Sequence, residues 1–211
     1  NTSGADELHR AALAANALAR CYAQAVQALL EAADIPASAV QAILACVTSG
    51  GKVLVCGNGP SAAAAQQFAA FCVAGFERER PELAALALAA DSTLLTAGTA
   101  GMGGTGATQD VTQLFSRQVR ALGQAGDVLL ILSVSGSDTN LLAAAEAAHE
   151  RDMTVLVLTG RTGGKIATLL RETDVSINVP HDRPARVREV HALVLHCLSD
   201  GVDAQLLGEQ E

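Results

Sequence analysis

Two stretches of sequence decide the fold: KVLVCGNGPSA at residues 52–62 and DVLLILSVSGSDTN at residues 127–140. Each begins with a short run of apolar residues and ends in a loop of small and polar residues, which a helical segment follows. The apolar runs show no alternation of apolar and polar residues, as is typical of strands buried on both faces of a parallel sheet. Both loops should then lie at the carboxyl ends of central strands, where α/β sheets bind their ligands.

The rest of the chain repeats this alternation. Further strands are expected at residues 83–90, 153–160 and 174–179, and helices at 61–74, 109–121, 138–150, 164–170 and 184–207. A short helix is expected at 91–98, whereas five glycines within residues 98–107 predict a loop. Strands that alternate with helices form right-handed crossovers. We therefore predict an α/β fold, a three-layer α/β/α sandwich around a five-stranded parallel sheet.

The first 50 residues show a helical pattern only. Residues 6–33 are rich in Ala and contain no Gly or Pro, which predicts one long helix. Ser38 and Gln41 match a capping box, so a second helix is expected at about 39–48, ended by Gly50 and Gly51. The sequence thus predicts an N-terminal helical extension at 1–50 and a single globular unit at 51–211.

Composition excludes several classes of protein. The net charge of −8 argues against a nucleic-acid-binding protein, because such proteins neutralise phosphates with Lys and Arg. No apolar run is long enough to span a bilayer, and no signal peptide opens the chain as given. The five cysteines are scattered without a CxxC motif, which favours reduced thiols in a cytoplasmic protein.

The first loop, GNGPSA at 57–62, has the chemistry of an anion site. Its glycines allow backbone N–H groups to face an anion at a helix N-terminus, and Ser61 adds a hydroxyl. The loop also matches the weak dinucleotide pattern GxGxxA, but Glu77 and Glu79 precede the next expected strand and Asp91 follows too late for a ribose contact. A purely structural turn is the third alternative.

The second loop carries four hydroxyl side chains, which are Ser133, Ser135, Ser137 and Thr139. Hydroxyl and N–H donors at the end of a parallel strand favour a ligand site. The alternative is an ordinary Ser- and Asp-rich helix cap.

With these loops, MTVLVLTGRTGGK at 153–165 and ARVREVHALVLH at 185–196 resemble the sugar isomerase (SIS) domain family. The resemblance runs from about residue 10 to the C-terminus. It is strongest to the branch that holds phosphoheptose isomerases and the DnaA initiator-associating proteins (DiaA). It implies a flavodoxin-like sheet, a homotetramer and a phosphorylated sugar such as sedoheptulose 7-phosphate as ligand.

The resemblance also assigns site residues. The phosphosugar-binding positions that it implies are Asn58, Gly59, Ser61, Ser133, Ser135 and Asp138. A Thr and a Ser of the family loop are replaced here by Val134 and Asp138. A carboxylate at position 138 is expected to repel a phosphate dianion.

The positions that the family uses for acid–base chemistry and metal binding have changed. They are Gln67, Phe71 and Arg188 in this chain, and only His196 is retained. A phenylalanine neither ligates a metal nor transfers a proton. These substitutions predict no catalytic residues, no metal and no cofactor.

Two further stretches, GFERERPEL at 75–83 and CLSDGVDAQLL at 197–207, are most similar to the initiator-associating proteins. In those proteins the residues matching Leu206 and Leu207 contact the replication initiator. The resemblance therefore predicts a non-catalytic homotetrameric scaffold that binds DnaA, keeps a vestigial phosphosugar pocket, and contacts neither nucleic acid nor membrane. The alternatives are a phosphoheptose isomerase, which acts on sedoheptulose 7-phosphate, and a sugar-phosphate-binding module of unknown partner.

The remaining polar residues are expected to be structural. His191 falls on the same helical stripe as Val194 and Leu198, which predicts a core histidine. His196 falls on the opposite face, where it is expected to be solvated or to reach a neighbouring subunit. Residues 77–80, ERER, are expected to form a solvated, charged edge.

Overall fold

The computed structural model describes residues 2–31, 34–95 and 110–208. Its centre is a sheet of five parallel strands in the order β2-β1-β3-β4-β5. The strands are β1 (Val53–Gly57), β2 (Ala85–Ala87), β3 (Val128–Leu132), β4 (Thr154–Gly160) and β5 (Val175–Val179). Every residue of β1 and β3 is buried, as the continuous apolar runs predict. The predicted five-stranded parallel sheet is confirmed.

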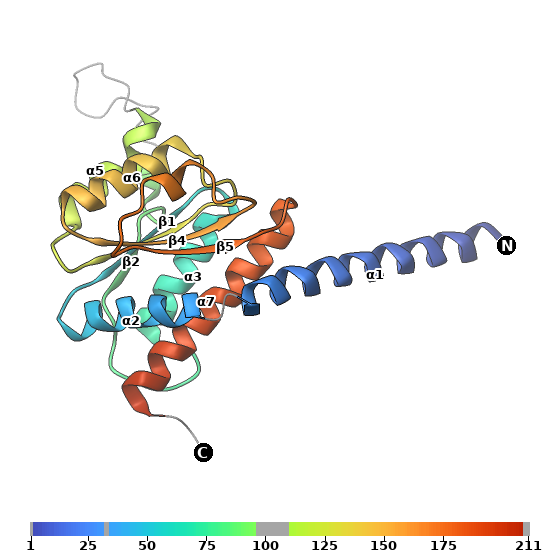
Figure 1. The fold of residues 1–211 in the computed structure, drawn as a ribbon, viewed down its shortest axis with the longest axis horizontal. Helices are drawn as coiled ribbons and strands as arrows, with labels where there is room; N and C mark the ends of the chain where they lie inside the picture. Colours follow the sequence, from blue (N-terminus) through green and yellow to red (C-terminus); the bar gives the residue numbers. More distant parts are fainter. Residues whose placement is uncertain (1, 32–33, 96–109, 209–211) are drawn as a thin grey trace.

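Helices cover both faces of the sheet (Figure 1). One face packs against α2 (Asp34–Thr48), α3 (Pro60–Ala74) and α7 (Pro184–Leu207), and the other against α5 (Leu114–Leu122) and α6 (Thr139–Glu150). Each face has its own apolar core, built mainly from Ala, Val and Leu. The three-layer arrangement is therefore as predicted.

The order of the strands places the two Gly- and Ser-rich loops side by side. The chain passes from β1 to β2 on one side and then returns to β3 on the other side of β1. Gly57 at the end of β1 is in register with Leu132 at the end of β3. The loops that follow them diverge to opposite faces of the sheet, and this reversal leaves a crevice at the carboxyl edge.

Helix α1 (Thr2–Glu31) extends away from the body of the molecule (Figure 1). Tyr22 and Val26 pack against the core formed with α7, and Cys21 Sγ lies 3.1 Å from Nε2 of His181. The five cysteines are all free thiols. None of the helices that the structure describes combines the length and apolarity needed to cross a lipid bilayer.

Several predicted elements differ in length from those observed. The strand predicted at 83–90 is only three residues long, because its alanines have low β propensity. Helix α2 already begins at Asp34, so Ser38 lies within the helix and the predicted capping box is wrong. The helix predicted at 164–170 is a shorter 3-10 helix, η2 (Lys165–Thr168). The helix predicted at 109–121 opens with a 3-10 turn, η1 (Val111–Gln113), before α5. The predicted glycine loop at 98–107 lies outside the described residues.

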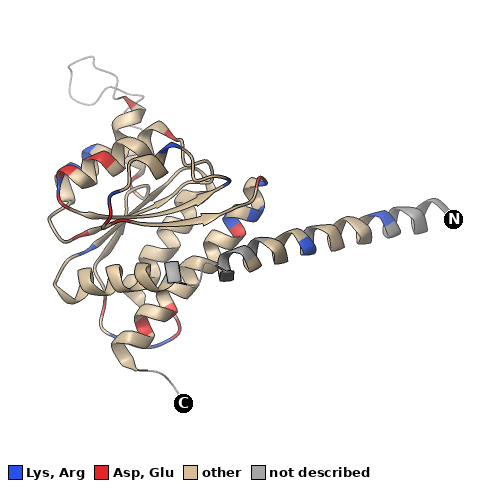
Figure 2. Cartoon of the chain, in the orientation of Figure 1, with Lys and Arg blue, Asp and Glu red and all other residues tan. Residues whose placement is uncertain are grey.

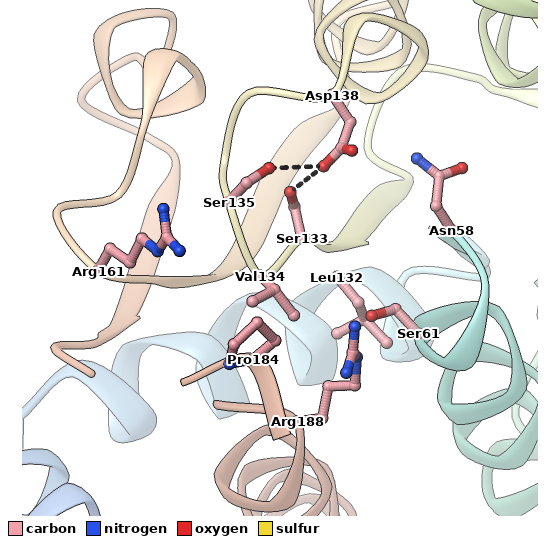
Figure 3. Close-up of a pocket in the computed structure, with 10 residues that line it drawn as sticks. All are labelled: Asn58, Ser61, Leu132, Ser133, Val134, Ser135, Asp138, Arg161, Pro184 and Arg188. Atoms are coloured by element: carbon pink, nitrogen blue, oxygen red, sulfur yellow. Dashed lines mark hydrogen bonds between the residues drawn. The ribbon is translucent and has the colours of Figure 1, made fainter. Parts of the chain in front are cut away.

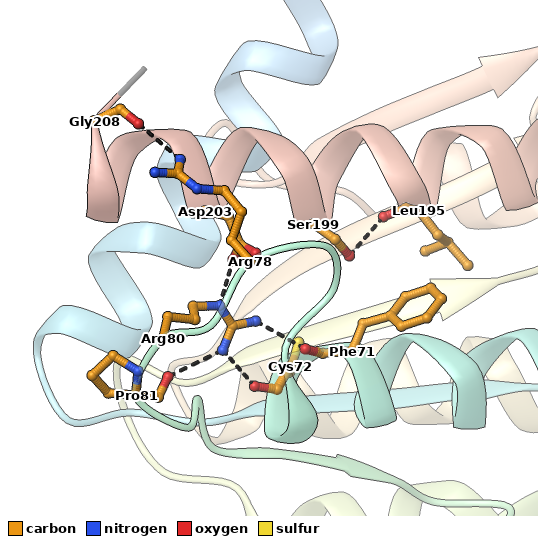
Figure 4. Close-up of polar contacts among 9 residues, drawn as sticks. All are labelled: Phe71, Cys72, Arg78, Arg80, Pro81, Leu195, Ser199, Asp203 and Gly208. Atoms are coloured by element: carbon orange, nitrogen blue, oxygen red, sulfur yellow. Dashed lines mark hydrogen bonds and ion pairs between the residues drawn. The ribbon is translucent and has the colours of Figure 1, made fainter. Parts of the chain in front are cut away.

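The charged edge predicted at 77–80 is wrong for Arg80. Its guanidinium is buried and forms an ion pair with Asp203 of α7, with side-chain exposures of 2 % and 1 % (Figure 4). It also donates to the carbonyls of Phe71, at 2.9 Å, and Cys72, at 2.8 Å, at the end of α3. One side chain thus satisfies the C-terminal carbonyls of α3 and joins that helix to α7.

Candidate functional site

A cavity of about 300 Å³ lies at the carboxyl edge of the sheet, beside the ends of β1 and β3 (Figure 3). Its walls come from the loops after β1, β3 and β4 and from the start of α7. The lining residues are Asn58, Ser61, Leu132, Ser133, Val134, Ser135, Asp138, Arg161, Pro184 and Arg188. Five of the six predicted phosphosugar-binding positions therefore line one cavity, and Gly59 does not line it.

Asp138 occupies the donors of the serine loop. Its Oδ2 accepts hydrogen bonds from Oγ of Ser133, at 2.6 Å, and from Oγ of Ser135, at 3.0 Å (Figure 3). Asp138 is the residue that precedes α6, yet its carboxylate makes no capping hydrogen bond to that helix. The carboxylate thus takes the two hydroxyls that the family resemblance assigns to a phosphate.

The two loops are linked by a pair of amides. Asn58 donates to Asn140 Oδ1 at 3.0 Å, and Asn140 donates back to Asn58 Oδ1 at 2.9 Å. This reciprocal pair fixes the loop after β1 against the first turn of α6. Asn58 was expected to contact the ligand directly, and its amide is engaged in this link.

Backbone geometry holds the third loop against the second. Gly136 has a positive φ of 62°, and a Cβ built there would come within 1.9 Å of the Gly163 carbonyl oxygen. Arg161 also has a positive φ, of 56°, which is uncommon for a residue with a side chain. Such strain concentrates at functional sites. Here it places a guanidinium at the cavity.

A second cavity, of about 590 Å³, lies between α3 and α7 and adjoins the first at Ser61, Leu132 and Arg188. Its lining is mainly apolar. The residues are Pro60, Ser61, Ala63, Ala64, Gln67, Leu132, Arg188, Glu189, His191 and Ala192. Together the two cavities form one cleft, which we call the β1–β3 cleft.

The four positions of the family's acid–base and metal set do not come together in this cleft. Gln67 and Arg188 line it, but Phe71 packs against Phe76 and His196, with ring centroids 4.8 and 5.5 Å away. His196 is half-buried, and its Nε2 is buried without a hydrogen-bond partner among the described residues, so this ring nitrogen is not solvated. The ring lies in an aromatic cluster between α3 and α7. The alternative, contact with a neighbouring subunit, stays a prediction.

A metal ion does not fit these residues. An arginine repels a cation, a phenylalanine has no donor atom, and a glutamine amide is a weak ligand. Throughout residues 2–31, 34–95 and 110–208, no three His, Cys, Asp or Glu side chains are placed to hold a metal ion.

His191 is a core histidine, as predicted, with 2 % of its surface exposed. Its Nε2 donates to the Thr159 carbonyl oxygen at 2.9 Å. Burial lowers the pKa of His191 to about 4, so the ring is neutral at neutral pH. Sequence reasoning did not find that this ring borders the β1–β3 cleft.

Leu206 and Leu207 lie at the end of α7, with 37 % and 39 % of their surfaces exposed. At 1.5 Å per residue, Leu206 is about 27 Å along the helix from Arg188. Any contact made by these residues is therefore remote from the cleft.

Comparison with known proteins identifies the family of the chain. The profile of the SIS domain family matches residues 15–160. The chain belongs to the SIS domain family. The match includes the loops after β1 and β3, and thus the half of the cleft that carries the hydroxyl side chains.

Similar proteins within the family share one name. The chain is 56 % identical over 175 residues to a phosphoheptose isomerase of Methylibium petroleiphilum, covering 83 % of this chain and 84 % of that protein. It is 47 % identical over 195 residues to one of Dechloromonas aromatica, covering 90 % and 96 %. The solved phosphoheptose isomerase of Francisella tularensis superposes with a TM-score of 0.81 at 39 % identity, covering 89 % and 95 %. That of Neisseria gonorrhoeae superposes with 0.76 at 45 % identity, covering 90 % and 98 %.

These relatives overturn the prediction of a non-catalytic scaffold that binds DnaA. Proteins similar over most of the chain are named phosphoheptose isomerases. The two stretches that favoured the scaffold, 75–83 and 197–207, have a structural role in which Arg80 pairs with Asp203, and Leu198 and Val202 fill the core.

Sequence reasoning missed three residues that shape the cleft. Arg161 directly follows β4, and its place at the end of a parallel strand was a usable signal. Arg188 was considered only as a residue that cannot bind a metal, and its positive charge as a ligand contact was not considered. Asn140 gave no sequence signal, because its partner Asn58 is 82 residues away.

Proposed function

We propose that this chain is a sugar-phosphate isomerase that acts on a phosphorylated heptose. The observation that carries the proposal is its identity of 47–56 % to proteins named phosphoheptose isomerase, over 82–90 % of the chain. The position of the cleft agrees with this function, because it lies where the strand order reverses at the carboxyl edge of the sheet. Hydroxyl and guanidinium groups there suit a phosphorylated polyol.

The reaction requires a proton carrier. Conversion of a ketose phosphate to an aldose phosphate moves one proton from C1 to C2 and another from the C1 hydroxyl to the C2 oxygen. The carrier must be a base at neutral pH and must reach the cleft. Among the described residues that line the cleft, the candidates are Asp138, His191 and Glu189.

Two of these candidates are less suitable. Asp138 already accepts two hydroxyl hydrogen bonds on one oxygen, and the free ring nitrogen of His191 is buried from solvent. Glu189 is 42 % exposed at its side chain and has one carboxylate oxygen held by Arg186 of the same helix. We therefore assign the proton transfer between carbons to Glu189.

One observation favours a second candidate function, a sugar-phosphate-binding module without turnover. Phe71 and Arg188 stand where the resemblance implies a carboxylate and a metal ligand, and Phe71 is packed against other rings. A chain with Phe71 and Arg188 at these positions retains the cleft and the hydroxyl and guanidinium donors that line it. It would bind a phosphorylated sugar and release it unchanged.

The two functions are separated by incubating the purified full chain with sedoheptulose 7-phosphate and following the aldose phosphate by NMR. For the isomerase we expect turnover that falls by about 10²–10⁴ in Glu189→Gln. Glu146→Gln is the matched control, because Glu146 is exposed on α6, across the sheet from the cleft. Binding without turnover favours the module, and turnover that Glu189→Gln leaves unchanged refutes the assignment of the base.

A further inference from the structure

We propose that the β1–β3 cleft holds the phosphate group of its ligand with Arg188 and Arg161, in place of the serine hydroxyls of the loop after β3. The proposal rests on the proposed function only in that the cleft takes a phosphorylated sugar. It concerns binding and not turnover. Three observations on separate residues support it.

First, the serine loop already holds an anion of its own. Both hydroxyl hydrogen bonds end on Oδ2 of Asp138. Ser133 Oγ also accepts from the Gly136 N–H at 2.9 Å, and Ser135 Oγ accepts from the Ser137 N–H at 3.2 Å. A phosphate at these hydroxyls would have to displace a carboxylate and then lie beside it, which like charge opposes.

Second, Arg188 is a half-buried cation without a counter-ion. It lines both parts of the cleft, and its Nε is buried with no hydrogen-bond partner. Within the described part of the chain, no carboxylate lies within ion-pairing distance of it. Arg80, Arg120 and Arg186 each pair with a carboxylate. A guanidinium N–H that is buried without a hydrogen-bond partner is costly, and a phosphate oxygen would supply that partner.

Third, Arg161, an exposed residue, lines the cavity from a different wall, the loop after β4 (Figure 3). Its left-handed backbone, with φ of 56°, is secured by the hydrogen bond that Asn178 donates to its carbonyl oxygen at 2.9 Å. Within the same described part of the chain, it too forms no ion pair. Two guanidinium groups on different walls of one cavity suit the several oxygens of a phosphate monoester.

Asp138 then has a role in specificity. Its carboxylate keeps a dianion away from the serine loop, so the phosphate lies towards the arginines. The sugar hydroxyls, which are donors, lie towards the carboxylate. The replacement of the family's Ser by Asp138 thus moves the anion-binding position of the cleft from the serine loop to the arginines.

The test measures binding of sorbitol 6-phosphate, a phosphate monoester with no carbonyl group to isomerise, to the full chain by calorimetry. We expect Arg188→Gln to weaken binding by about tenfold or more. Arg117→Gln is the matched control, because Arg117 is exposed on α5 and changes the net charge equally. Arg161→Asn tests the second cation, because Asn tolerates a positive φ.

A second background tests the role of Asp138. In Asp138→Ser the hydroxyls of Ser133 and Ser135 no longer donate to a carboxylate and can bind the phosphate. The loss of sorbitol 6-phosphate affinity caused by Arg188→Gln should therefore shrink to about twofold in this background. Thermal unfolding checks that each variant is folded. The proposal is overturned if Arg188→Gln and Arg161→Asn both bind like the Arg117→Gln control, or if the unmodified chain does not bind the probe at about 10 mM. An equal loss in both backgrounds overturns the role given to Asp138.

These outcomes are independent of catalysis. A chain that binds sorbitol 6-phosphate through Arg188 but does not convert sedoheptulose 7-phosphate retains this inference and loses the proposed isomerase. A chain that converts sedoheptulose 7-phosphate but binds sorbitol 6-phosphate equally well after Arg188→Gln retains the proposed isomerase and loses this inference.

Discussion

The ion pair between Arg80 and Asp203 should be worth far more to stability than an exposed pair. Replacement of Arg80 by Met removes the guanidinium and leaves the Asp203 carboxylate, which is 1 % exposed at its side chain, without its counter-ion. It also removes hydrogen bonds to the carbonyls of Phe71 and Cys72. Breaking a buried pair in this way costs about 3–5 kcal/mol.

This loss is measurable by urea unfolding at fixed protein concentration and by calorimetry. For a chain of this size, 1 kcal/mol lowers Tm by about 2–4 °C, so Arg80→Met should lower it by about 6–20 °C. The exposed pair of Arg120 and Glu150, with side-chain exposures of 43 % and 54 %, supplies the control. Arg120→Met should cost no more than about 1 kcal/mol.

The double variant Arg80→Met/Asp203→Leu isolates the cause. With both charges removed, no buried carboxylate remains unpaired, and much of the lost stability should return. If Arg80→Met costs no more than Arg120→Met, the guanidinium does not secure α3 to α7. If the double variant is as unstable as the sum of the single variants, the unpaired charge is not the cause.

Three further predictions concern Gly136 in the loop after β3, the core histidine His191 and the assembly of the chain. Gly136→Ala should destabilise the chain by more than about 2 kcal/mol, because its Cβ would meet the Gly163 carbonyl at 1.9 Å. Gly126→Ala, at φ of 87° with open space around it, should lose only about 1–2 kcal/mol, and equal losses in urea unfolding would disprove the steric argument. The pKa of His191 is about 4 in the folded chain, so the unfolded chain binds a proton first as the pH falls below about 6.5. Between pH 7 and 5 the free energy of unfolding should fall by about 2 kcal/mol more than in His191→Gln, and parallel pH profiles would contradict this. The chain should form a homotetramer, because Leu13 of α1 and Val73 of α3 are 54 % and 47 % exposed and α3 carries no charged residue (Figure 2). A monomer mass by light scattering at micromolar concentration would refute it.

The fold was predictable because its signals are local. The continuous apolar runs at β1, β3 and β4, and the glycines that follow them, identify buried parallel strands without any knowledge of distant contacts. Pro184 and Gly208 bound α7 at the positions expected of helix-starting and helix-ending residues. The short strand β2 was less predictable, because its alanines have low β propensity and its length also depends on pairing with β1.

The candidate site was predictable only in part. The hydroxyls of Ser61, Ser133 and Ser135 were found because they follow strands, and the structure brings them to one cavity. The engagement of Asp138 by two of them was not predictable, since it depends on rotamers that place the carboxylate away from its own helix. The predicted scaffold function was wrong because the substitutions at Gln67, Phe71 and Arg188 are local, whereas similarity to proteins named phosphoheptose isomerase extends over 82–90 % of the chain.

The sequence by itself determined the succession of strands and helices along the chain, the two ligand loops and the core histidine, because each depends on spacing and composition within a short segment. Only the tertiary structure decided which charges are paired. Arg80 pairs with Asp203 across 123 residues, whereas Arg188 and Arg161 line one cavity and, within the residues that the structure describes, neither is paired with a carboxylate. Arg80 and Asp203 are brought together by the packing of α3 against α7, and no local sequence pattern predicts a contact between residues so far apart in the chain.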